Sequence, residues 1–402
     1  MNCKLLVIFL LIFPGISIGQ NLSVKIDGSG DYDNIQAAVD AAQANDTVIV
    51  HPGTYTGTGN RDIYVDKHIT VRSTDPNNPD IVAATIINCQ ANQQNNHKGF
   101  IVLGYYCFPV INGLTIMNAH SENGAGIDLY KGGIRNCRII DNTGIGVYLG
   151  GRETYLTDTY ISNNTESGVY IFDGYISVDN CRVENNSGPG IWVSYDNSVS
   201  LSNSIIRNNL SSGVYFGCSF GAVNNCLITG NVSFGSGGGI FLIDAPIFIT
   251  NCTIIGNYAR TGGGICGLSR VYRDYQYITN CIIQNNRALQ GDQIALTQSD
   301  PPGPTDTAIF NFCNIQGDKY DIYMSNGLSS YQYDWAQGNI DSDPLFAQPG
   351  YWDANWTPAD PNDDYWVAGD HHLMGGSPCI DAGDSNSITL QSDLDESERF
   401  FD

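Results

Sequence analysis

Aromatic side chains recur at one fixed place in the middle of the chain. Each follows a glycine by two residues, in the segments GVYL, GVYI, GIWV, GVYF and GIFL. They are Tyr148, Tyr170, Trp192, Tyr215 and Phe241. An aromatic ring combines a flat apolar face with a polar edge, which suits the C–H faces and hydroxyl groups of a sugar. The spacing therefore predicts a row of sites that could contact a polysaccharide.

The stretch SGPGIWVS shows which way these rings point. Alternation along a strand would bury Ile191 and Val193 and place Trp192 on the outer surface. If successive segments stack about 4.8 Å apart, the five rings form a stripe about 19 Å long. The nearest polar residues lie in the turns just beyond the strands, at Tyr195, Asp173 and Asp196. The alternative is that the rings only stack on one another and stabilise a sheet surface.

A repeat supplies the elements that would hold this stripe. Seven segments align, from NCRIIDN at Asn136 to NCIIQNN at Asn280, and their starts lie 22 to 29 residues apart. The second residue of each segment is Cys, Thr or Ser. Counted from that residue, a β-branched residue stands two positions later and an asparagine stands five positions later. A period near 22 residues with short β-branched runs is typical of one turn, or rung, of a parallel β-solenoid.

Three columns of this alignment predict different roles. The β-branched column would fill the core. The asparagine column would occupy tight left-handed turns and bond from rung to rung; it contains Asn142, Asn164, Asn186, Asn209, Asn231, Asn257 and Asn286. The third column interchanges Cys with Thr and Ser, which predicts small buried side chains and free thiols. Cys226, Cys252 and Cys281 on consecutive rungs would lie within disulfide reach, so their pairing stays open.

The repeated NCxIxxN…GIxV motif, from Gly113 to Leu296, resembles the right-handed parallel β-helix repeat family of exported bacterial proteins. This resemblance implies an all-β fold, a right-handed parallel β-helix (solenoid). In polysaccharide-active members of that family, the face with the aromatic column commonly carries the binding cleft. The segment from Gly28 to Gly57 resembles the N-terminal cap of pectin methylesterases and pectate-lyase-like proteins. Its apolar positions at helical spacing, from Ile35 to Ala42, predict a capping helix, and a strand is expected at 47–51.

The chain divides into five segments. They are a signal peptide at 1–19, an N-terminal cap at 20–60, first irregular coils at 61–112, regular β-helix repeats at 113–316 and a C-terminal closing segment at 317–402. The closing segment is expected to be truncated, and a surface anchor beyond residue 402 stays open.

The net charge of the chain restricts the kinds of molecule it can bind. Formal charge is −23, from 41 acidic and 18 basic residues, which argues against nucleic acid and anionic lipid surfaces. The signal peptide predicts a secreted or cell-surface protein, and no later segment is apolar enough to span a membrane. We therefore expect a monomer whose partner is an extracellular polysaccharide, through Tyr148, Tyr170, Trp192, Tyr215, Phe241, Tyr195 and Asp173.

Catalysis has weaker support in the sequence. A polysaccharide lyase needs a base, and the candidates are Arg270, Tyr272, Arg273 and Tyr275 in the insert GLSRVYRDYQY. A glycoside hydrolase needs two facing carboxylates, for which Asp128, Asp173 and Glu153 are candidates. A third alternative is a structural or adhesive surface protein with no ligand on the stripe.

Metal-ligating patterns are few. Asp370-His371-His372 could suggest a metal, yet adjacent histidines point in different directions. Acidic turns at Asp360 to Trp366 and at Asp341 and Asp343 could hold calcium. We expect no cofactor and no metal at the aromatic column, and leave calcium open.

Overall fold

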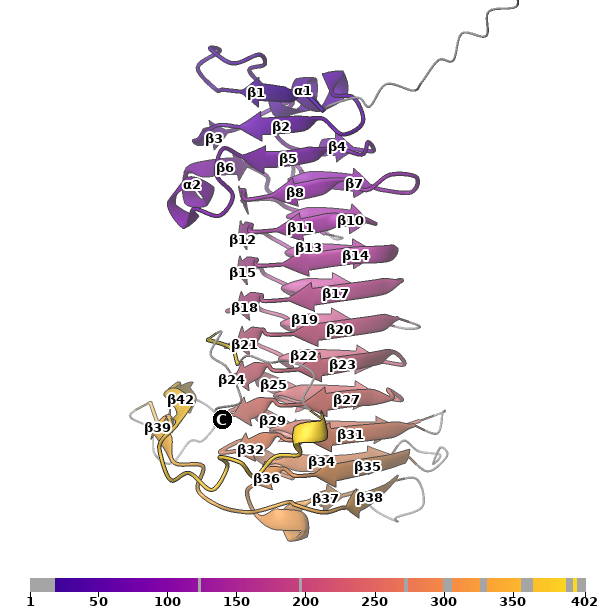
Figure 1. Ribbon diagram of the computed structural model, residues 1–402, viewed down its shortest axis with the longest axis vertical. Helices are drawn as coiled ribbons and strands as arrows, with labels where there is room; N and C mark the ends of the chain where they lie inside the picture. Colours follow the sequence, from indigo (N-terminus) through magenta and orange to yellow (C-terminus); the bar gives the residue numbers. More distant parts are fainter. Residues whose placement is uncertain are drawn as a thin grey trace, which may run out of the picture.

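The chain forms one elongated solenoid (Figure 1). The computed structural model describes residues 19–121, 124–194, 197–270, 274–298, 306–325, 331–355, 364–387 and 393–395. The signal peptide predicted at 1–19 lies outside the described residues, apart from its last position. None of the helices in these ranges is long and apolar enough to cross a membrane.

In the described ranges, three long parallel sheets run along the solenoid, and each rung passes through sheets B, C and A in turn. Sheet A contains β1 (Asn21–Val24), β2 (Thr47–Val50), β5 (Thr70–Ser73), β8 (Val110–Asn112), β11 (Gly133–Arg135), β14 (Arg152–Thr157), β17 (Tyr175–Asp179), β20 (Ser198–Ser202), β23 (Phe220–Asn224), β27 (Ile247–Thr250), β31 (Tyr275–Thr279), β35 (Asp306–Asn311) and β38 (Tyr331–Trp335). Sheet B contains β3 (Gly53–Tyr55), β6 (Thr85–Asn88), β9 (Thr115–Met117), β12 (Arg138–Ile140), β15 (Tyr160–Ser162), β18 (Arg182–Glu184), β21 (Ile205–Arg207), β24 (Leu227–Thr229), β28 (Thr253–Ile255), β32 (Ile282–Gln284) and β36 (Asn314–Ile315). Sheet C contains β4 (Ile63–Val65), β7 (Phe100–Leu103), β10 (Ile127–Tyr130), β13 (Val147–Gly150), β16 (Val169–Ile171), β19 (Ile191–Val193), β22 (Val214–Gly217), β26 (Ile240–Ile243), β30 (Ile265–Ser269), β34 (Ile294–Gln298) and β37 (Tyr323–Met324).

A helix closes the N-terminal end, as the sequence predicts (Figure 1). It is α1 (Ile35–Ala41), and the Asn34 side chain caps it by accepting a hydrogen bond from the Ala37 amide. Ile35, Ala38 and Val39 are buried against the first rung. A second helix, α2 (Pro79–Ala84), which the sequence did not indicate, contacts β6. The fold class and its capping helix are therefore confirmed.

Residue columns in the sequence become columns in space. The β-branched side chains of the repeat are paired in register along sheet B and are fully buried; they are Ile139, Ile161, Val183, Ile206, Ile228, Ile254 and Ile283. Parallel pairing already includes β4 to β8, within residues 61–112, where irregular coils were expected. The domain boundaries themselves remain a prediction.

The asparagine column forms a ladder, with one correction. From Asn142 to Asn257, each side-chain amide nitrogen donates to the Oδ1 atom of the asparagine on the next rung, at 2.9–3.0 Å, and Asn286 is the last acceptor. The same Oδ1 also accepts the backbone N–H of the preceding asparagine. The expected left-handed backbone is wrong for these residues: it belongs to the residue just before each of them, such as Asn208 (φ 54°). The residue with the buried side-chain amide and the residue in the left-handed turn are therefore neighbours and not the same residue.

The cysteine column is buried and reduced. The cysteines of this column, Cys137, Cys181, Cys226, Cys252 and Cys281, form no disulfide. Burial raises the pKa of Cys137 to about 11 and that of Cys181 to about 12. These thiols act as small apolar side chains that fill the corner between sheets A and B.

The C-terminal segment turns back along the side of the solenoid (Figure 1). After β38 it forms two antiparallel pairs, β39 (Phe346–Gln348) with β42 (Asp370–Leu373) and β40 (Tyr351–Asp353) with β41 (Tyr365–Val367). Trp366 is buried with Phe346 against Ile255, on the outer face of sheet B. A short row of β25 (Val232–Ser236), β29 (Tyr258–Thr261) and β33 (Arg287–Gln290) extends the rungs beside it.

Candidate functional site

The predicted aromatic column exists on the outer face of sheet C. The register pairs Tyr148 with Tyr170, Tyr170 with Trp192, Trp192 with Tyr215, and Tyr215 with Phe241. Successive ring centroids lie 5.2, 5.2, 5.5 and 5.4 Å apart. The structure therefore brings all five together, and we call them the aromatic ladder. Their role in binding remains a prediction.

The rings of the ladder also pack on one another. Tyr148 and Tyr170 are nearly parallel, with 21° between their planes. Trp192 meets Tyr170 at 79° and Tyr215 at 68°, and Phe241 meets Tyr215 at 75°. Such edge-to-face contacts stabilise a sheet surface without any ligand. Trp192 is 38% exposed and the other four rings are half-buried, so Trp192 offers the most free surface.

Different residues border the two ends of the ladder. At the N-terminal end, Asp128 is in register with Tyr148, and its carboxylate lies 2.9 Å from the Lys98 ammonium group. At the other end, Cys266 continues the column but is fully buried. A glycine-rich turn passes next to the ladder at this end. A Cβ atom added at Gly237 would lie 2.5 Å from the Cβ of Phe241. Only glycine can pass this close to the ladder.

The predicted polar rim is only partly described. Asp173 is exposed in the turn between β16 and β17. Tyr195 and Asp196 lie outside the described residues. Next to Asp173, Phe172 stacks on Tyr148 with centroids 4.7 Å apart, which widens the aromatic surface at this end of the ladder.

The catalytic candidates from the sequence do not converge on the ladder. Arg270 is exposed in the turn after β30, and Tyr275 begins β31 in sheet A; Tyr272 and Arg273 lie outside the described residues. Among the carboxylates, Asp128 pairs with Lys98, and Glu153 lies 3.5 Å from the Lys131 ammonium group. Neither carboxylate is therefore a free acid or base opposite a second one.

The histidine pair points in two directions, as expected. His371 packs against the Phe346 ring, and burial lowers its pKa. His372 lies between Asp370 and Asp395, and its hydrogen bonds to these carboxylates raise its pKa. The two rings therefore share no ligand position.

The acidic turns proposed for calcium use their oxygens locally. Asp341 accepts a hydrogen bond from the Gly317 amide, and Asp343 accepts one from the Leu345 amide. In the segment from Asp360 to Trp366, residues 360–363 lie outside the described residues, and Asp364 pairs with Arg287.

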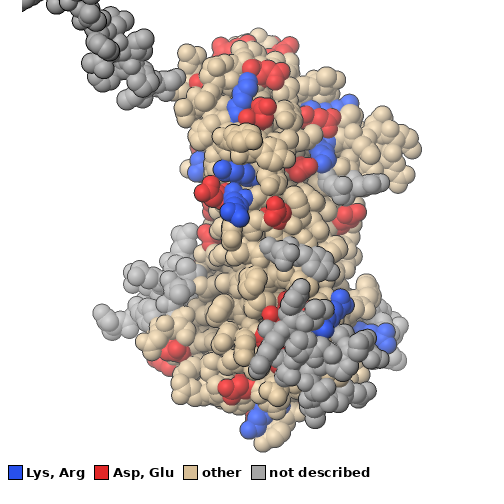
Figure 2. All heavy atoms as spheres, turned by 90° about the vertical axis from the view of Figure 1, so that its right-hand side faces the viewer, with Lys and Arg blue, Asp and Glu red and all other residues tan. Residues whose placement is uncertain are grey.

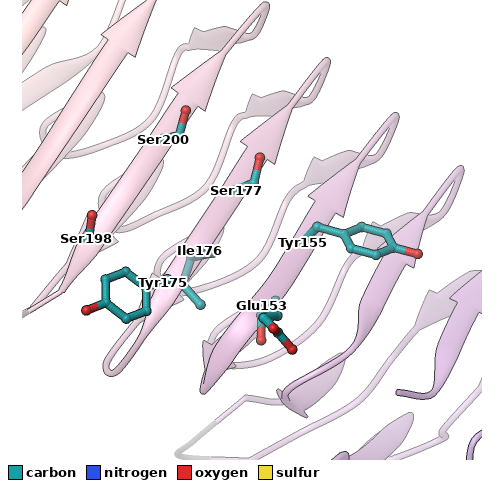
Figure 3. Close-up of a pocket in the computed structure, with 8 residues that line it drawn as sticks. Glu153, Tyr155, Tyr175, Ile176, Ser177, Ser198 and Ser200 are labelled. Carbon is teal, nitrogen blue, oxygen red and sulfur yellow. The ribbon is translucent and has the colours of Figure 1, made fainter. Parts of the chain in front are cut away.

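A second surface, on sheet A, was missed in the sequence. A shallow depression of about 410 Å³ lies over β14, β17 and β20. Tyr155 and Tyr175 border it, and Ser177, Ser198 and Ser200 form part of its floor (Figure 3). Further along the same sheet, exposed rings follow at Phe220, Phe248 and Tyr275. The signal was present in the alternation of YISVD and SVSLS, whose outward residues stand five and three positions before the next Asn-Cys or Asn-Ser turn.

Positive charge is unevenly distributed over the surface. On the face shown in Figure 2, lysine and arginine side chains lie mainly over the N-terminal half of the solenoid, among acidic side chains, and fewer lie near the C-terminal end. Lys98 and Lys131, which pair with Asp128 and Glu153, belong to this half of the chain. The middle of the ladder, around Trp192, consists of uncharged residues.

A comparison with protein-family models agrees with the fold. Residues 101–244 match the family model described as right handed beta helix region. The periplasmic alginate epimerase AlgG has 12% sequence identity and a TM-score of 0.49, over 74% of this chain and 77% of that one. The pectate lyase Pel9A has 15% identity and a TM-score of 0.42, over 96% and 98% of the two chains. The pectin methylesterase from Aspergillus niger has 14% identity and a TM-score of 0.38, over 79% and 92%. No curated protein matches the sequence.

Proposed function

We propose that this chain, a right-handed parallel β-helix protein, is exported and binds a polysaccharide along its aromatic ladder. The observation that carries the proposal is the register of five aromatic side chains, with 5.2–5.5 Å between successive centroids. The exposed ring of Trp192 lies at the centre of this row. A straight row of rings matches an extended polymer better than a compact small molecule, which would need an enclosed pocket.

The charge around the ladder favours a neutral polysaccharide. The protein carries a formal charge of −23, which repels an acidic chain. Lys98, next to the first rung of the ladder, is already paired with Asp128. A polyuronate would therefore have to displace this ion pair, whereas a neutral glycan needs only ring faces and hydroxyl contacts.

The proposal does not include a chemical reaction. Asp128 and Glu153 each form an ion pair with a lysine. Arg270 lies in the turn that leads to sheet A, away from the ladder. Binding alone accounts for the arrangement of the ladder without a base or a second carboxylate.

The sheet A depression is a second candidate surface for the same function. Tyr175 is 56% exposed there, more than any ring of the ladder, and serines beside it offer hydroxyl groups to a sugar. Phe248 and Tyr277 stack in parallel, with 8° between their planes, further along this face. Variants of each surface decide which one binds.

The test is retention on a panel of insoluble neutral and acidic polysaccharides. Replacing Trp192 and Tyr170 by alanine should weaken retention by about tenfold or more, because each lost ring contact contributes about 1 kcal/mol. Tyr320→Ala, which removes an 81% exposed ring elsewhere, is the matched control and should bind normally. Loss of retention in Tyr175→Ala but not in the ladder variant would assign binding to sheet A. Unchanged retention in both variants would contradict the proposal.

A further inference from the structure

Three aspartates from consecutive rungs meet at the corner where the chain passes from sheet C to sheet A. Asp244 follows β26, Asp274 precedes β31 and Asp306 begins β35. One carboxylate oxygen from each lies within 4.8 Å of the other two. Their exposed fractions are 3%, 8% and 0%. Three acidic groups are therefore held close together and away from water.

The backbone creates this cluster in two ways. Asp274 and Asp306 occupy matching positions on neighbouring rungs, because Tyr275 pairs with Thr307 in the parallel register. Asp244 stands one position earlier in its rung and reaches the others through a left-handed backbone, with φ at 44°. Aspartate tolerates this conformation better than most residues, though at some cost. The turn thus places a third carboxylate where the register alone would place Ala245.

Hydrogen bonds fix one side of the cluster. The Arg270 amide donates to Oδ1 of Asp244 at 2.6 Å, and the Asp274 amide donates to Oδ1 of Asp306 at 3.0 Å. These bonds orient the carboxylates of Asp244 and Asp306. The Oδ2 atoms of Asp274 and Asp306 are buried and have no hydrogen-bond partner among the described residues.

Two of the three carboxylates have no compensating charge among the described residues. Neither Asp274 nor Asp306 forms an ion pair with any residue that the structure describes. A cation held between Asp274 and Asp306 would give their buried Oδ2 atoms a partner and would balance their charge.

We propose that Asp244, Asp274 and Asp306 together bind one calcium ion, which joins three consecutive rungs at this corner. A ligand set made only of carboxylate oxygens selects hard cations and disfavours zinc and copper, which prefer nitrogen or sulfur. Calcium accepts irregular geometry and completes its shell with carbonyl oxygens or water, whereas magnesium demands a near-ideal octahedron. The ion would neutralise most of the buried charge.

This site differs from the acidic turns that the sequence indicated. Asp341 and Asp343 accept hydrogen bonds from nearby backbone amides. They therefore provide a matched control: a calcium effect that depends on Asp343 would belong to that turn and not to the corner.

The first experiment is calorimetric titration of CaCl₂ into the full chain after EDTA treatment, at pH 7.5. We expect one ion per chain, with a Kd of about 10⁻⁴ M, in the range of extracellular calcium modules. Calcium at 10 mM should raise the melting temperature by about 5 °C. MgCl₂ should bind at least about tenfold more weakly. No heat and no shift up to 10 mM calcium would overturn the proposal, and equal binding of magnesium would overturn the assignment to calcium.

The second experiment locates the ion. Asp306→Asn and Asp274→Asn should each weaken calcium binding by at least about tenfold, because each removes one charged ligand. In EDTA at pH 7.5 both variants should melt at or above the temperature of the parent chain, since they relieve uncompensated buried charge. This second readout separates loss of the site from loss of the fold. Asp343→Asn should bind calcium like the parent. Normal binding by Asp306→Asn, or loss of binding by Asp343→Asn, would overturn the proposal.

Discussion

The Glu184 carboxylate lies 2.6 Å from the Nε atom of Arg207, one rung further along sheet B. Arg182 and the Tyr160 hydroxyl donate to the same carboxylate, at 2.7 and 2.8 Å. Glu184 is only 4% exposed, so three donors on three successive rungs share one buried acceptor. This cluster joins rungs on the outer face of sheet B, as the asparagine ladder does inside.

Glu184→Gln should lower the free energy of unfolding by about 2 kcal/mol at pH 7, because hydrogen bonds to a charged group are lost. Burial acts to raise the pKa of Glu184, but the hydrogen bonds from Arg182, Arg207 and Tyr160 hold it below its usual value of 4.5. The stabilisation is therefore present above pH 4.5 and disappears as the pH falls through the folded-state pKa. Urea unfolding of parent and variant at pH 7 and pH 2.5 measures this. The exposed Glu166→Gln is the control, and a difference that persists at pH 2.5 would contradict the explanation.

The asparagine ladder should be far less tolerant than the turn beside it. Asn209→Ala removes the Oδ1 atom that accepts from both the backbone and the side chain of Asn186. The buried backbone N–H of Asn186 then has no acceptor, and its side-chain amide keeps only the carbonyl oxygens of Glu184 and Ile161. The expected loss is about 3 kcal/mol in chemical unfolding. Asn208→Gly should change stability by less than about 1 kcal/mol, because glycine accepts the left-handed backbone of Asn208. Equal losses in both variants would contradict the separation of the two roles.

Trp192 contributes to stability as well as to the proposed binding. Its two edge-to-face contacts, with Tyr170 and Tyr215, are worth about 1 kcal/mol each. Trp192→Ala should therefore lower the free energy of unfolding by about 2 kcal/mol, measured by urea unfolding. Trp192→Phe should retain at least half of this stability. A ladder that only stacks on itself predicts this loss with no change in polysaccharide retention.

The returning C-terminal segment depends on Trp366. A Cβ atom added at Gly256 would lie 2.1 Å from Cδ2 of this ring, so the indole packs directly on the backbone of the turn after β28. Trp366→Ala should free the segment, and limited proteolysis with mass spectrometry should show cleavage between residues 346 and 387. The solenoid should keep its circular dichroism spectrum. Tyr351→Ala, which removes an exposed ring from the same segment, should leave the cleavage pattern unchanged.

The buried thiols should remain unreactive in the native protein. Cys226, Cys252 and Cys281 are almost fully buried and unpaired, and burial raises the pKa of Cys226. A thiol reagent should label them only after unfolding, without prior reduction. Intact mass should show no loss of two hydrogens at these positions. A pair that becomes reactive only after reduction would show that a disulfide forms between rungs.

Much of the fold was predictable because parallel stacking turns sequence columns into spatial columns. Ile206, Asn209 and Tyr215 each lie next to the residues that align with them in neighbouring repeats. The position of the aromatic ladder follows from the same rule. The orientation of its rings does not, since it depends on rotamers that neighbouring side chains select together.

The remaining features depend on irregular parts of the chain. Asp244, Asp274 and Asp306 are 30 and 32 residues apart, outside the 22-residue period, and Asp244 is displaced by one position. An alignment of the repeats at a constant period therefore does not place these three aspartates in one column. The contact of Trp366 with Gly256 joins segments with no common pattern. The left-handed backbone of Asn208 was assigned to its neighbour, because either asparagine could occupy such a turn.

Each rung of the repeat begins with a residue in the left-handed conformation, so the protein can gain or lose length only by whole rungs. Residues 158–179 begin with the left-handed Asp158 and include the ladder residue Asn164, and Asn180 starts the next rung in the same way. A duplicated copy of this segment would find every partner it needs, whereas deletion of one residue would reverse the faces of the strands after it. Whole-rung duplication would also add another copy of Tyr170. The aromatic ladder can therefore lengthen by one ring at a time while the rest of the fold is preserved.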